Sequence, residues 1–90
     1  MATSPALSTR DVLLTIVRVV SPYLGETMAR SAAQAHCQKL GIEADRMQPG
    51  QVEALITKMG AGLNVFVGRD KSSAIIAELR RAIEGQGAVP

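Results

Sequence analysis

Aromatic residues and cysteine are scarce in this chain. Tyr23 and Phe66 are the only aromatic side chains among 90 residues, so the core must consist of aliphatic side chains and alanine. Alanine and leucine favour helices, whereas sheets are enriched in β-branched and aromatic residues. The single cysteine, Cys37, excludes a disulfide scaffold and favours a reducing compartment, so we expect a cytoplasmic protein.

Long hydrophobic runs and clusters of one charge are also absent. The apolar segment from Val12 to Val20 is interrupted by Arg18 and is too short to cross a membrane, so we expect no membrane span. The formal net charge of +2 comes from ten basic and eight acidic residues that are interspersed along the chain. This distribution is not typical of a polybasic nucleic-acid-binding protein.

The chain has room for one domain, because domains rarely have fewer than about 50 residues. We expect a flexible tail over residues 1–7, a helical domain over 8–84 and a second flexible tail over 85–90. Periodic patterns predict helices at 8–24, 26–40, 49–67 and 71–84. The predicted fold is therefore all-α, a compact four-helix bundle whose third helix is bent by glycines.

The first helix has a clear beginning and end. Ser8 or Thr9 can cap its N-terminus, and the pair Ser21-Pro22 predicts a kink or an end shortly before Gly25. Its many β-branched residues make a buried strand the alternative. Strict alternation is absent and the pattern is long for a strand, which favours a helix.

The third helix contains two glycines. Gln48 and Pro49 suit the N-cap and the first helical position. The apolar stripe that follows keeps its helical phase across Gly60 and Gly62, which predicts one bent helix. The alternative is a break at Gly60 followed by a short extended segment over 64–67.

The other two helices are bounded by glycine and by a capping residue. Gly41 closes the second helix, whose apolar side consists mostly of alanine and lets a neighbouring helix approach closely. Asp70 is the expected N-cap of the fourth helix, and Gly85 its stop.

Catalytic signals are weak. His36 and Cys37 are adjacent, so on a helix their side chains diverge by about 100° and cannot act on each other directly. There is no carboxylate cluster, and a lone histidine on an apolar helix face is typical of a core or interface residue. We expect no enzyme activity, no cofactor and no metal.

A nucleic-acid-binding domain is the alternative function. The run from Gln34 to Ile42 is similar in pattern to the first helix and turn of a helix-turn-helix motif. Pro49 then arrives where a recognition helix should continue. Four basic residues in the last third of the chain are the candidate contacts: Arg69, Lys71, Arg80 and Arg81.

The broad apolar face of the first helix needs an explanation. A helix of a four-helix domain buries a third to a half of its surface, and this face is wider. Either the helix is central, or part of it binds another chain, a second copy or a different protein. We expect a non-enzymatic interaction or homodimerisation module, with these contact residues: Leu14, Val17, Val20 and Phe66. A small-molecule sensor is compatible with the sequence, but no specific residue favours it.

Overall fold

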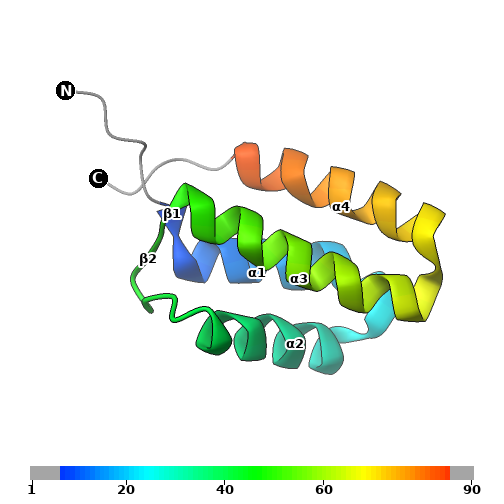
Figure 1. Ribbon diagram of the computed structural model, residues 1–90, viewed down its shortest axis with the longest axis horizontal. Coiled ribbons are helices and arrows are strands. Elements are labelled where there is room, and N and C mark those ends of the chain that lie inside the picture. The colour runs from blue at the N-terminus through cyan, green and yellow to red at the C-terminus, as the bar shows by residue number, and fades with distance from the viewer. Residues whose placement is uncertain (1–6, 86–90) are drawn as a thin grey trace.

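The computed structural model describes residues 7–85 and is mostly helical, which confirms the all-α class (Figure 1). The predicted helix ranges agree with the structure within two residues at every end. The helices are α1 (Thr9–Leu24), α2 (Glu26–Lys39), α3 (Pro49–Val67) and α4 (Arg69–Glu84). α1 continues through its proline to Leu24. Apart from Leu7 and Gly85, the two expected tails lie outside the described residues.

A single glycine joins the helices of each hairpin. Gly25, between α1 and α2, has a φ of 87°, and Gly68, between α3 and α4, has a φ of 86°. Each glycine N–H donates to the carbonyl oxygen four residues earlier, and each glycine carbonyl accepts from the N–H four residues later. L side chains rarely adopt this backbone conformation, so glycine lets one residue end a helix and begin the next. Gly68 is therefore the N-cap of α4, and the expectation that Asp70 has this role is wrong.

The helix α3 is continuous across both of its glycines, so the alternative of a break at Gly60 is wrong. Gly60 faces α4, and a Cβ atom there would lie 3.4 Å from the Ile76 side chain. A Cβ atom at Gly62 would meet nothing within 4 Å. Gly60 therefore marks the close approach of α3 and α4.

A short pair of antiparallel strands, β1 (Leu7–Ser8) and β2 (Arg46–Met47), was not predicted. Leu7 pairs with Met47, so the ordered domain includes one residue of the expected N-terminal tail. Met47 is fully buried, although it lies between the predicted helices at 26–40 and 49–67. The pair brings the start of α1 next to the start of α3, at one end of the molecule (Figure 1).

The helix α1 contacts all three other helices and both strands. α1 and α3 run in one direction and α2 and α4 in the other (Figure 1). Aliphatic side chains from every helix form the core, as the scarcity of aromatic residues requires. Its largest fully buried side chains are Val12, Ile16, Val20, Met47, Leu55, Ile56, Leu63, Ile75 and Leu79.

Candidate functional site

An open apolar groove of about 360 Å³ runs between α1 and α2. Apolar side chains and small residues line most of it, and polar side chains lie at its edges. Its lining residues are Thr9, Arg10, Leu13, Leu14, Val17, Arg30, Ala33, Gln34 and Ala44. A cleft of this volume with a few polar groups is the usual form of a binding site in a protein.

Helical spacing explains why α1 supplies the apolar side of the groove. Val17 lies four residues after Leu13 and three after Leu14, so it shares a face of α1 with both. The neighbouring face, with Val12 and Ile16, is fully buried in the core. Although α1 is central in the fold, Leu14 remains 55% exposed and presents a large aliphatic side chain to solvent.

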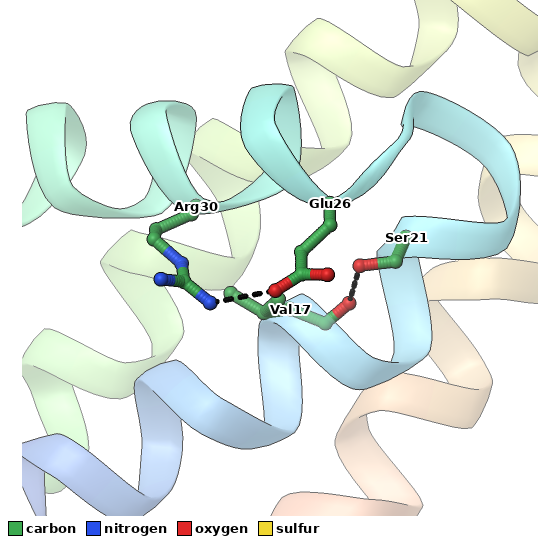
Figure 2. A network of polar contacts seen from close by, with 4 residues as sticks. All are labelled: Val17, Ser21, Glu26 and Arg30. Atoms are coloured by element: carbon green, nitrogen blue, oxygen red, sulfur yellow. Dashed lines mark hydrogen bonds and ion pairs between the residues drawn. The ribbon is translucent and has the colours of Figure 1, made fainter.

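The second helix contributes small and charged residues. Ala33 is fully buried, and its short side chain lets α1 and α2 approach closely along the bottom of the groove. Near Val17, the Arg30 Nη2 atom lies 2.8 Å from Oε1 of Glu26, and both side chains extend from α2 toward α1 (Figure 2). This ion pair is exposed and contributes little to stability.

Two hydroxyl groups fix the backbone around the groove. The Ser21 hydroxyl donates a hydrogen bond to the carbonyl oxygen of Val17, one turn earlier in α1 (Figure 2). The Thr9 hydroxyl donates to the carbonyl oxygen of Glu43 at 2.7 Å, which holds the loop that carries Ala44 against the start of α1. The groove therefore has one end at this loop and the other end beside the Arg30–Glu26 pair.

The structure separates the four residues predicted to form an interface. Leu14 and Val17 line the groove. Val20 has no exposed surface, so it belongs to the core and its prediction as a contact residue is wrong. Phe66 is 59% exposed but lies in the last turn of α3, and it does not line the groove.

The four basic residues of the nucleic-acid alternative all lie on α4, but their surroundings differ. Arg69 and Arg80 line a shallow hollow of about 530 Å³ between α3 and α4. Arg80 is engaged there, because its Nη1 atom lies 2.5 and 2.6 Å from the two carboxylate oxygens of Glu53. The ammonium group of Lys71 instead lies over the Tyr23 ring, 5.9 Å from its centre. Arg81 lines neither this hollow nor the α1–α2 groove.

The helix-turn-helix interpretation of residues 34–42 is wrong. In that motif a turn of about three or four residues separates the helices. Here α2 ends at Lys39 and α3 begins at Pro49, and the long connection contains a strand. No recognition helix follows the turn, because residues 43–45 form a loop.

The adjacent residues His36 and Cys37 have different environments: His36 lies near basic side chains, and Cys37 is buried in an apolar environment. Burial lowers the pKa of His36, and the nearby charges of Lys39 and Lys58 lower it further. Its Nδ1 atom is buried without a hydrogen-bond partner among the described residues. Burial also raises the pKa of the Cys37 thiol, which disfavours the reactive thiolate.

Within residues 7–85, no three His, Cys, Asp or Glu side chains gather where they could hold a metal ion. In the same part of the chain, no helix has both the length and the apolar character needed to cross a bilayer.

Comparison with protein-family models, curated proteins and solved structures gives no match. The candidate site therefore depends on the geometry of the groove alone.

Sequence reasoning missed most of the groove. It identified Leu14 and Val17, but it treated Arg10 and Arg30 only as dispersed surface charges. The available signal was the alanine-rich face of α2, which predicts a close helix neighbour. The sequence does not say which neighbour, and a groove exists only where two faces meet.

Proposed function

We propose that this protein is a non-enzymatic interaction module that binds another polypeptide through the groove between α1 and α2. The observation that carries this proposal is Leu14, a large aliphatic side chain left 55% exposed in an apolar groove. Full burial of a leucine side chain contributes about 1.5–3 kcal/mol. Binding a partner over Leu14 and Val17 would recover part of this free energy.

The partner in this proposal is a second copy or a different protein. An interaction module of this kind needs no cofactor, and we place it in the cytoplasm because of its cysteine usage.

We further propose that the four helices form a bundle whose third helix bends at its glycines, since glycine weakens a helix locally. The pairwise contacts of α1 with α2 and of α3 with α4 support such an arrangement.

The experiment is a helical-peptide selection against the full chain, combined with the absolute mass by light scattering. Each selected peptide is tested on Leu14→Asp and on a control, Val65→Asp. Val65 is 83% exposed and does not line the groove, so the two variants introduce the same charge in place of an exposed aliphatic residue. Circular dichroism checks that both variants keep their helicity.

We expect Leu14→Asp to abolish peptide binding or dimer formation, and Val65→Asp to leave both unchanged. A charge placed in an apolar contact must lose its water, which costs several kcal/mol. A monomer whose selected peptides bind wild type and Leu14→Asp equally well would overturn the proposal.

One observation favours the alternative function, binding of nucleic acid. Arg69 and Arg80 line the same hollow as Asn64 and Ser73, and such side chains commonly contact phosphate. Because Glu53 holds Arg80, Glu53→Gln should increase any affinity for duplex DNA. The measurement is fluorescence anisotropy at about 50 and 500 mM salt, where phosphate contacts predict a steep loss of affinity. No binding by either protein at about 50 mM salt would exclude this function.

A further inference from the structure

Two arginines lie at opposite ends of the apolar part of the groove. Arg10 belongs to the first turn of α1, next to the end that Thr9 and Ala44 form. Arg30 extends from α2 toward Val17, which is seven residues further along α1 (Figure 2). Seven residues of an α-helix span about 10.5 Å, or two turns. The aliphatic side chains of α1 lie between these two charges.

Both arginines have donor groups to offer. Among residues 7–85, no carboxylate forms an ion pair with Arg10. Arg30 donates to Glu26 through Nη2 alone, and its side chain is 56% exposed. A guanidinium group has five N–H donors, so Arg30 can donate hydrogen bonds to a second carboxylate as well as to Glu26.

The surrounding charges disfavour a second copy of this chain in the groove. α1 and α2 together contain four cationic residues and two acidic ones. A symmetric dimer through this groove would bring Arg10 and Arg30 of one protomer close to the same residues of the other, and like charges across an interface are unfavourable. Glu43 and Asp45 flank Ala44, but they line a separate hollow with Arg46.

We propose that the groove binds an acidic amphipathic helix of another protein, an inference that rests on the proposed function. Apolar residues of this helix at positions i, i+3 and i+4 would contact Leu13, Leu14 and Val17. Two carboxylates about seven residues apart, one on each side of the apolar residues, would pair with Arg10 and Arg30. A helix in a groove buries its apolar face with this spacing, and charge complementarity selects its sequence and register.

The test uses a displayed library of amphipathic helical peptides with leucine at the three apolar positions. Two flanking positions, seven residues apart, are randomised among Glu, Gln and Lys. We expect glutamate to be enriched at both positions. The selected peptides should bind Arg10→Gln and Arg30→Gln about two- to fivefold more weakly than wild type, as for partly exposed ion pairs. The control is Arg18→Gln, because Arg18 is exposed on α1 but does not line the groove.

The possible results separate this inference from the proposed function. Peptides that bind with no preference for glutamate, and that lose binding only in Leu14→Asp, would overturn the acidic partner and leave the interaction module intact. If the wild-type protein is a dimer and Leu14→Asp dissociates it, the acidic partner is likewise overturned and the interaction module is left intact. If the protein is a monomer and the selected peptides bind wild type and Leu14→Asp equally well, both the acidic partner and the interaction module are overturned. Equal affinity of Arg10→Gln, Arg30→Gln and Arg18→Gln for the acidic peptides would also overturn the inference.

Discussion

The hydroxyl group of Ser72 on α4 donates a hydrogen bond to the carbonyl oxygen of Gly60 on α3, with 3.2 Å between the two oxygens. Ser72 is 3% exposed, and Gly60 has no side chain to separate the helices. Two small residues therefore meet at a close contact between α3 and α4. This contact holds the second hairpin together at the end nearer its glycine turn.

Enlarging Ser72 should force these helices apart. We expect Ser72→Leu to lower the free energy of unfolding by about 1–3 kcal/mol, because added methylene groups in a packed contact displace backbone and side chains. The control is Ser73→Leu at the neighbouring exposed position, where we expect a change within about 0.5 kcal/mol. Urea denaturation measures both. Equal effects of the two substitutions would contradict the close contact.

The two glycines of α3 should respond differently to alanine. Gly62→Ala should stabilise the protein by about 1 kcal/mol, since alanine favours the helix and its Cβ meets nothing within 4 Å. Gly60→Ala should stabilise it less, because its Cβ would lie 3.4 Å from Ile76. The free energies of unfolding of both variants test this order. An equal gain at both positions would mean that α4 does not restrict Gly60.

Acid should destabilise the fold through His36. Because burial and two lysines lower the pKa of this side chain, the folded state binds its proton less readily than the unfolded chain does. The unfolded state then binds more protons as the pH falls below about 6.5, the usual pKa of histidine, and the free energy of unfolding decreases.

The measurement is the free energy of unfolding from pH 7.5 to 5.0, for wild type and for His36→Gln, which cannot take up this proton. We expect the wild type to lose more stability than the variant over this range. Every other titrating group is shared by the two proteins. Parallel curves would therefore show that the fold does not perturb His36.

The thiol of Cys37 should be protected in the folded protein. It is 7% exposed and its pKa is raised by burial, and alkylation requires an accessible thiolate. We expect iodoacetamide at pH 7.5 to modify the native protein far more slowly than the protein in urea. Mass spectrometry over time measures both rates, and similar rates would contradict the burial of this side chain.

The sequence by itself determined the helices, because their signals are local. Apolar residues at helical spacing mark each segment, and Gly25, Pro49 and Gly68 mark boundaries where the backbone needs a positive φ or lacks an N–H. The Ser8 side chain accepts a hydrogen bond from the N–H of Asp11, as a helix cap should. Each signal acts within a few residues and does not depend on the rest of the fold.

The tertiary structure decided which residue of each apolar face is buried and which is left for a partner. Val20 and Leu14 both belong to the broad apolar face of α1, yet one is fully buried and the other is 55% exposed. Their difference depends on where α2, α3 and α4 pack. The same is true of the Leu7–Met47 pairing and of the ion pair between Arg80 and Glu53, which join distant segments.

The candidate site depends partly on the local sequence pattern and partly on the tertiary packing. Its apolar residues follow from the pattern of α1, whereas the positions of Arg10 and Arg30 at its ends follow from the antiparallel packing of α1 and α2 around Gly25. A helical pattern specifies a face but not its neighbour, because burial depends on contacts between segments that are far apart in the chain. Only the packed hairpin turns two amphipathic faces into a groove with a charge at each end.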